Sequence, residues 1–257
     1  MDDFLRVENK LNDCCFIAVG YRCFTAAFMK IKKHNLVFET LPFDNGFFPP
    51  QSIASILKCG NMNLLLDDEK EPKNFSFCKK YGEPNFRNRF LSTEGKSFQV
   101  ISEIEIDEQL KSGYDNKLLD HLRGYYVLNE DHDYVLAHYL WHKSSEKYKT
   151  NYRNKIDIIS SMFQRRLKRL NEICAGHKNK FFIHYHYQPY NSVRIRDIEY
   201  DLTDMDILKN QLTESFGENT LLCFSNFKKK NENGIFYFDH TEYKNFCKYA
   251  SSNINNK

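Results

Sequence analysis

The segment KFFIHYHY at residues 180–187, together with residues 203–216 and the segment TLLCF at residues 220–224, decides the fold. The first and last of these are short apolar runs typical of buried strands. The middle segment has apolar residues at helical spacing and begins at Thr203, a residue type that favours the start of a helix. A strand, a helix and a second strand in this order predict a parallel pair joined by a right-handed crossover.

The same alternation of strands and helices continues toward both ends of the chain. The apolar run CFIAVG at residues 15–20 predicts a strand, and residues 23–33 predict the helix that follows it. Residues 154–175 predict the longest helix, because apolar side chains recur every three or four residues along it. This apolar stripe comprises Ile156, Ile159, Phe163, Leu167, Leu170 and Cys174. The pattern predicts a single α/β domain over residues 1–257, with a mostly parallel, Rossmann-like sheet that carries helices on both faces.

Two segments depart from this alternation. Residues 67–97 are polar and contain two prolines and two glycines, which predicts an irregular insertion or lid. The last strand and helix are predicted at residues 234–239 and 241–250. Residues 251–257 follow them and predict a flexible tail.

Composition limits the partners and the compartment. The net charge of +3 balances 37 basic against 34 acidic residues, so no nucleic-acid partner is expected. Eight cysteines at irregular spacings, without a C-x-x-C pair, indicate free thiols in a reducing compartment rather than a zinc site or disulfides. The chain begins MDD and has no run of 18 apolar residues, so neither a signal peptide nor a membrane span is predicted. We therefore expect a cytoplasmic protein.

The sequence GYRC at residues 20–23 spans the predicted turn from the first strand to the first helix. A thiol at the start of a helix meets the positive end of the helix dipole, and Arg22 adds a positive charge beside Cys23. Both effects lower the pKa of the thiol and favour the nucleophilic thiolate. The alternative is that Cys23 is a small buried apolar residue, which is the usual role of cysteine.

Two pairs of histidines are candidates for a site. His138 and His142 are four residues apart after an apolar run, and His184 and His186 share one face of a predicted strand. No third ligand lies close in sequence to His184 and His186, so no metal site is predicted. A pair of half-buried polar side chains is the preferred interpretation of these two residues.

Further polar residues lie in a loop and on the long helix. Asp44 and Asn45 belong to a proline-bounded loop and favour a turn by their own chemistry. Arg165 and Arg166 lie on or beside the polar face of the helix at residues 154–175. They can bind a phosphate or a sugar-nucleotide, and a solvated helix face is the alternative.

The order and spacing of these segments resemble the family of papain-like cysteine peptidases, a poorly characterised domain of bacteria and large DNA viruses. Family members carry a Gly-Ser-Asn-Cys-like turn, which corresponds to GYRC here. They also carry a Pro-Phe-Asp-Trp-like segment, which corresponds to PFDN at residues 42–45 after a strand predicted at residues 37–41. The remaining matches are AHY at residues 137–139, QRRLKRL at residues 164–170 and FFI at residues 181–183.

The resemblance implies a cysteine hydrolase or acyltransferase that needs no cofactor. Within this family the expected activity is that of a thiol protease. It implies that Cys23 is the nucleophile, that His138 is its base with His142 as the rival, and that Asp44 orients the base or a substrate. The implied substrate is a peptide, an acyl group or a glycan. The predicted substrate-binding residues are Arg22, Asn45, His142, Arg165 and Arg166. A carbohydrate-modifying or glycosyltransferase-like enzyme and a non-catalytic interaction domain are the alternatives.

Overall fold

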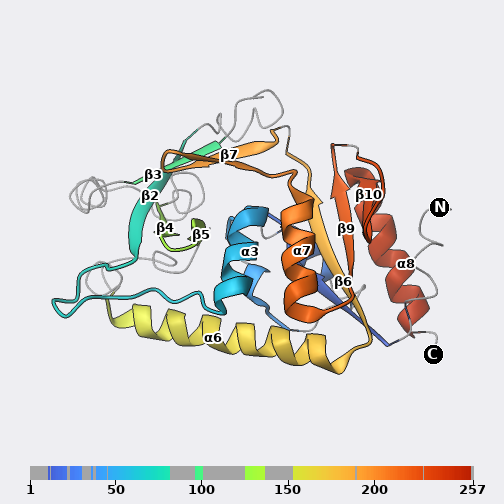
Figure 1. The fold of residues 1–257 in the computed structure, drawn as a ribbon, viewed down its shortest axis with the longest axis horizontal. Helices are drawn as coiled ribbons and strands as arrows, with labels where there is room; N and C mark the ends of the chain where they lie inside the picture. Colours follow the sequence, from blue (N-terminus) through green and yellow to red (C-terminus); the bar gives the residue numbers. More distant parts are fainter. Residues whose placement is uncertain are drawn as a thin grey trace, which may run out of the picture.

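Two β-sheets and the helices around them form a mixed α/β fold (Figure 1). One sheet has four strands and the other has six. This computed structural model describes residues 11, 13–21, 24–30, 36, 39–44, 46–81, 96–100, 125–136, 153–188, 190–227 and 229–255. Within these ranges, no helix combines the length and the apolar character that crossing a membrane requires.

The four-stranded sheet is parallel throughout, in the order β1-β6-β9-β10. Strand β6 pairs with β9 in parallel, which confirms the pair predicted from residues 180–224. The connection between them contains α7 (Met205–Phe216), as predicted, and before it a hairpin of the other sheet, residues 192–201, that was not predicted. Every residue of β9 is buried, which explains why residues 221–224 are continuously apolar rather than alternating. The strands are β1 (Cys14–Ala18), β6 (Asn179–His186), β9 (Thr220–Ser225) and β10 (Ile235–Asp239).

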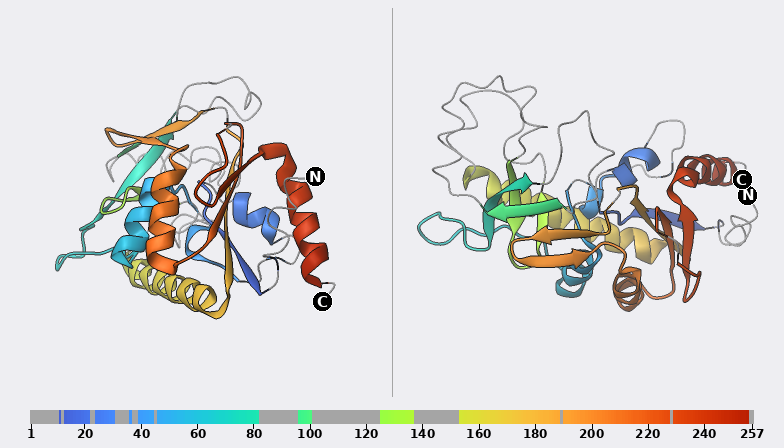
Figure 2. Two further views of the ribbon diagram at one scale, coloured as in Figure 1. Left: turned by 45° about the vertical axis from the view of Figure 1, so that its right-hand side comes forward. Right: turned by 90° about the horizontal axis from the view of Figure 1, so that it is seen from above.

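Helices cover both faces of the parallel sheet, as predicted (Figure 2). On one face Ile17 and Phe182 pack in a core cluster with apolar side chains of α3, α6 and α7. On the other face Phe16 and Phe224 pack with side chains of α2 and α8. The helices not yet bounded are α2 (Phe24–Met29), α3 (Pro50–Cys59), α6 (Arg153–Gly176) and α8 (Tyr243–Asn255).

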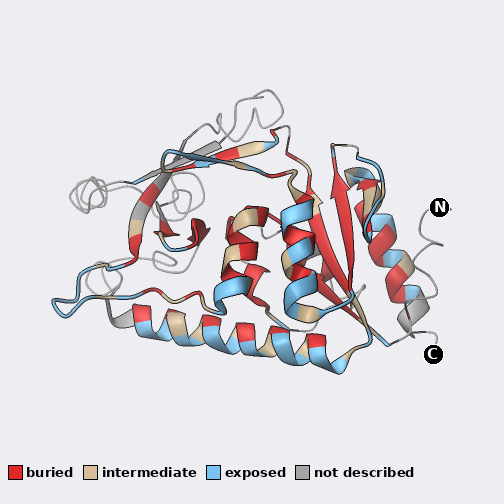
Figure 3. Cartoon of the chain, viewed as in Figure 1, coloured by how far each residue is buried: buried red, intermediate tan, exposed pale blue. Residues whose placement is uncertain are grey.

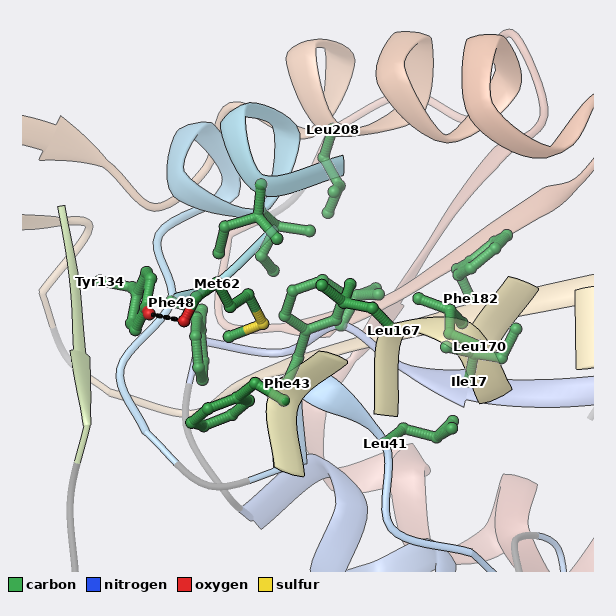
Figure 4. Packing of buried hydrophobic residues seen from close by; sticks show 14 of the residues in the cluster. Ile17, Leu41, Phe43, Phe48, Met62, Tyr134, Leu167, Leu170, Phe182 and Leu208 are labelled. Atoms are coloured by element: carbon green, nitrogen blue, oxygen red, sulfur yellow. Dashed lines mark hydrogen bonds between the residues drawn. The ribbon is translucent and has the colours of Figure 1, made fainter. Parts of the chain in front are cut away.

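Helix α6 confirms the predicted apolar stripe. Phe163 and Leu170 are fully buried, and the other members of the stripe are buried as well. Buried and exposed positions therefore alternate along the helix with its own period (Figure 3). Leu167 and Leu170 point from α6 toward the sheet, where Leu170 lies beside Ile17 and Phe182 (Figure 4).

The six-stranded sheet was not predicted. Its order is β5-β4-β2-β3-β7-β8, and its pairs are antiparallel except for β3 with β7. The prediction of one mostly parallel sheet therefore holds for only part of the structure. Several of these strands are three to five residues long, which is too short for a clear periodic signal. The strands are β2 (Phe75–Tyr81), β3 (Lys96–Val100), β4 (Tyr125–Asn129), β5 (Tyr134–Leu136), β7 (Ser192–Ile195) and β8 (Ile198–Asp201).

Three local predictions need correction. The segment predicted as irregular, residues 67–97, includes β2, which pairs with both β3 and β4. Residues 39–41, predicted as the end of a strand, are not in a strand. Helix α8 runs to Asn255, into the segment predicted as a flexible tail, and Ser251 is buried.

Candidate functional site at the carboxyl edge of the parallel sheet

The chain makes a tight turn where it leaves β1. Val19 extends the pairing with β6 by donating its N–H to the Ile183 carbonyl at 2.8 Å. A β-carbon on Gly20 would lie 1.7 Å from the hydroxyl oxygen of Thr25, so no larger residue fits at this position. Gly20 and Thr25, which lie on either side of residues 22–23 in the sequence, are therefore in close contact. This turn lies at the carboxyl ends of the parallel strands, where ligands bind in open α/β sheets.

The first turn of α2 is also held by the opposite end of the chain. Thr25 is buried, and its carbonyl accepts a hydrogen bond from the Tyr243 hydroxyl at 2.7 Å. Tyr243 is itself buried and stacks on Tyr185 of β6 with a ring-centroid distance of 4.6 Å. The start of α2 is thus fixed relative to β6 by a contact that spans most of the sequence.

Two buried histidines of β6 lie at the same edge. His184 and His186 are both fully buried, and their ring centroids are 6.3 Å apart. His184 Nδ1 lies 3.2 Å from the Val19 carbonyl, and His186 Nε2 lies 2.8 Å from the Tyr190 carbonyl. The ring of His186 also contacts Tyr21, at a centroid distance of 6.2 Å. Val19 and Tyr21 therefore pack directly on this histidine pair.

The burial of His184 decides its charge. Loss of solvation is the main cause that lowers the pKa of His184 to about 3, and the neighbouring His186 also lowers it. The hydrogen bond to the Val19 carbonyl raises the pKa, but its effect is smaller. His184 is therefore neutral at physiological pH, with its proton on the nitrogen that donates to Val19. Its Nε2 is buried without a hydrogen-bond partner among the described residues.

Asp44 is buried in the short 3-10 helix η1 (Pro42–Asp44) and is held by two contacts. Its Oδ2 accepts the backbone N–H of Leu41 at 2.8 Å and pairs with Lys30, the residue that follows α2. Its Oδ1 has no hydrogen-bond partner among the described residues. Desolvation raises the pKa of Asp44, while Lys30, Leu41 and the more distant Arg166 act in the opposite direction.

The structure separates the two arginines that were predicted to bind substrate. Arg165 is exposed, whereas Arg166 is half-buried, with its guanidinium 5.4 Å from the centroid of the Phe163 ring. Arg166 is also close enough to Asp44 to stabilise its carboxylate. Of the predicted site residues that the structure describes, Arg166 and Asp44 therefore lie near one another and Arg165 points to solvent.

Five predicted site residues lie outside the described residues. They are Arg22, Cys23, Asn45, His138 and His142. Among the residues that are described, no group of three or more histidine, cysteine or acidic side chains is arranged to hold a metal ion.

Sequence reasoning missed a second polar cluster, between α3 and the turn that joins β4 to β5. Ser55 Oγ lies 2.8 Å from His132 Nδ1, and Ser52 Oγ donates to the Asp133 carbonyl at 2.8 Å. Burial lowers the pKa of His132, although Asp131 and Asp133 oppose the shift. Ser55 and His132 are far apart in sequence and neither belongs to a motif, so no local signal could have paired them.

Comparison of the chain with protein-family models, with curated protein sequences and with solved structures finds no match.

Proposed function

We propose that this protein is a cysteine-dependent hydrolase or acyltransferase whose nucleophile is the Cys23 thiol. The observation that carries the proposal is the contact between Gly20 and Thr25, which lie on either side of Cys23 in the sequence. A tight strand-to-helix turn at the carboxyl edge of a parallel, Rossmann-like sheet is a position at which α/β enzymes expose a nucleophile.

The proposed reaction proceeds through a thioester. A histidine takes the Cys23 proton, the sulfur attacks the carbonyl carbon of the substrate, and the leaving group departs with that proton. Water or an acceptor then attacks the thioester carbonyl, and the thiol is regenerated. A peptide, an acyl group or a glycan ester would each provide the required carbonyl.

The proposed base is His138, with His142 as its rival. His186 is a third candidate because it contacts Tyr21, two residues before Cys23 in the sequence. Asp44 is proposed to orient the base or the substrate through Oδ1, since Oδ2 is engaged by Lys30 and Leu41. A reducing, cytoplasmic location is part of the proposal, and it is supported by the free thiols of the seven described cysteines.

Alkylation kinetics test the nucleophile. Iodoacetamide at neutral pH is expected to modify Cys23 faster than Cys59, which is exposed and serves as the control. Cys23→Ser should abolish hydrolysis of a panel of thioesters and aryl esters, and Cys59→Ser should leave it unchanged. Faster labelling of Cys59, or full activity of Cys23→Ser, would overturn the proposal.

The pH dependence of kcat/KM identifies the base. Alanine replacements of His138, His142 and His186 should include one that removes the acidic limb of the profile. If none of the three changes that limb, the nucleophile is not activated by any of these histidines.

A further inference from the structure

Strand β10 is the outermost strand of the parallel sheet, and its sequence favours pairing with another strand (Figure 1). Residues 235–238 read IFYF, a run of β-prone apolar side chains without a proline or a charge. An edge strand presents a row of backbone N–H and carbonyl groups on which a further strand can assemble. An open edge at β10 would therefore be an association site for a second copy of this chain.

The register with β9 fixes which backbone groups of β10 face outward. The Leu221 N–H of β9 donates to the Gly234 carbonyl at 2.9 Å, and the two strands are parallel. The backbone groups of successive strand residues point to alternate sides, so residues 236 and 238 face β9 in the same way as residue 234. The N–H groups of residues 235, 237 and 239 consequently face away from the sheet.

The loop before β10 covers the first two of these outward N–H groups. The Ile235 N–H donates to the Glu232 carbonyl at 2.7 Å, and the Ile235 carbonyl accepts from the Glu232 N–H at 3.2 Å. The Tyr237 N–H donates to Asn231 Oδ1 at 2.8 Å. Residues 231–232 thus take the place that a neighbouring strand would occupy along this part of the edge.

The segment after β10 covers the third outward N–H group. The Asp239 N–H donates to Glu242 Oε2 at 3.0 Å. In return, the Asp239 side chain accepts backbone N–H groups at the start of the 3-10 helix η3 (His240–Glu242), which completes a capping box. The Glu242 carboxylate therefore both fixes the start of η3 and occupies the last outward donor of β10.

We propose that Asn231, Glu232 and Glu242 form an edge cap that closes β10 to strand addition by a second copy of this chain. A pairing strand would have to accept hydrogen bonds from the outward N–H groups of β10. The edge cap occupies all three of these donors, so pairing would first have to break three hydrogen bonds, one of them to a carboxylate. Two of the three acceptors are side-chain oxygens, so the edge cap can be opened by replacements outside β10.

Hydrogen exchange in the wild-type protein is the first test, and it needs no variant to fold. Measured by NMR on the full chain, the amides of Tyr237 and Asp239 should exchange at least about tenfold more slowly than in an unstructured peptide. Exchange of these two amides at the rate of an unstructured peptide would overturn the proposal, because outward N–H groups without acceptors would leave the edge open.

Opening the edge tests the consequence for association. Asn231→Ala/Glu242→Ala removes both side-chain acceptors, so exchange at residues 237 and 239 in dilute solution should become at least about tenfold faster. Light scattering should then show a molar mass that exceeds that of the wild type and rises with concentration. In the associated form the same two amides should exchange slowly again, which locates the new contact at β10. Asn231→Asp/Glu242→Gln keeps an acceptor oxygen at each position and should behave as the wild type.

The double variant and a single variant together decide the proposal. A folded Asn231→Ala/Glu242→Ala protein whose molar mass equals that of the wild type at every concentration would overturn it, and so would association that leaves both amides in fast exchange. Asn231→Ala alone keeps the capping box, so it should accelerate exchange at Tyr237 and not at Asp239. An unchanged rate at Tyr237 in this single variant would also contradict the edge cap. The outcome is independent of the proposed function, which assigns no role to these residues.

Discussion

Asp133 and Arg196 form an ion pair that joins opposite ends of the six-stranded sheet. Asp133 lies in the turn between β4 and β5, and Arg196 lies in the turn between β7 and β8. Both residues have left-handed backbones, with φ of 49° and 55°, a conformation that is costly for residues other than glycine, asparagine and aspartate. Tyr200 of β8 donates to the second carboxylate oxygen of Asp133. Two hairpins that are far apart in sequence, at opposite edges of the sheet, are therefore held together by these contacts.

Replacing Asp133 or Arg196 should reduce stability, and the two replacements together should cost less than the sum of their separate effects. Asp133→Asn is expected to lower the free energy of unfolding by about 1–3 kcal/mol, because it weakens hydrogen bonds to a charged group while asparagine still tolerates the left-handed backbone. Arg196→Asn removes the other member of the ion pair, and asparagine tolerates the left-handed backbone at position 196 as well. A double-mutant cycle from urea unfolding should give a coupling energy of about 0.5–1 kcal/mol, at the low end because Arg196 is one-third exposed. Additive effects of the two replacements would contradict the pairing.

Gly20→Ala tests the turn that carries the proposed function. The new methyl group would overlap the hydroxyl of Thr25, so we expect a loss of about 1–3 kcal/mol or more in the free energy of unfolding. Gly176→Ala at the end of α6 is the control, since nothing lies within 4 Å of a β-carbon there. That replacement should be neutral or stabilising. Equal effects of the two replacements in thermal unfolding would argue against a tight turn at Gly20.

Phe163→Ala tests the packing of α6. Because the ring is fully buried, its removal should cost about 3–5 kcal/mol in the free energy of unfolding. Ile158→Ala on the exposed side of the same helix should change that free energy by about 0.5 kcal/mol or less. A cost below about 1 kcal/mol at Phe163 would place the stripe at the surface.

The buried His184 predicts that acid destabilises the fold. The pKa of His184 falls from 6.5 in the unfolded chain to about 3 in the folded protein, so below about pH 6.5 the unfolded chain binds a proton that the folded protein does not. Stability is therefore complete above the unfolded pKa and declines as the pH falls toward the folded pKa. Between about pH 7.5 and about pH 5 this linkage removes about 2 kcal/mol from the free energy of unfolding.

Replacement of His184 should flatten this pH dependence. His184→Asn keeps a side-chain donor for the Val19 carbonyl but cannot titrate, so urea unfolding at each pH should show a smaller slope than the wild type. Cys223→Ala, at the position opposite His184 in β9, is the control. It should lower stability by a similar amount at every pH in this range. An unchanged slope in His184→Asn would show that other groups cause the acid sensitivity.

The eight cysteines should all be reduced in the protein as isolated. The seven described cysteines are free thiols, and the spacing of all eight in the sequence is irregular. Alkylation under denaturing, non-reducing conditions should therefore add eight labels by mass. A stoichiometric bridge in the untreated protein would remove the argument for a reducing compartment.

The sequence by itself determined the features that depend on local periodicity. The stripe of α6 follows from side chains that repeat with the helix, and the β6-α7-β9 unit follows from two apolar runs around an amphipathic segment. The burial of Phe163 and Leu170 could be predicted for the same reason. The placement of Gly20 at a strand-to-helix turn was also readable, because a glycine that ends an apolar run is a local signal.

Only the tertiary structure decided which distant residues meet. Asp133 and Arg196, and Ser55 and His132, are each separated by more than 60 residues in the sequence. None of these four residues belongs to a motif, and their contacts arise from the way the hairpins of the six-stranded sheet and α3 pack together. Short strands with few buried positions carry little periodic signal, so the six-stranded sheet and its pairs had to be observed. A side chain's partners are set by the packing of whole elements, which local patterns do not encode.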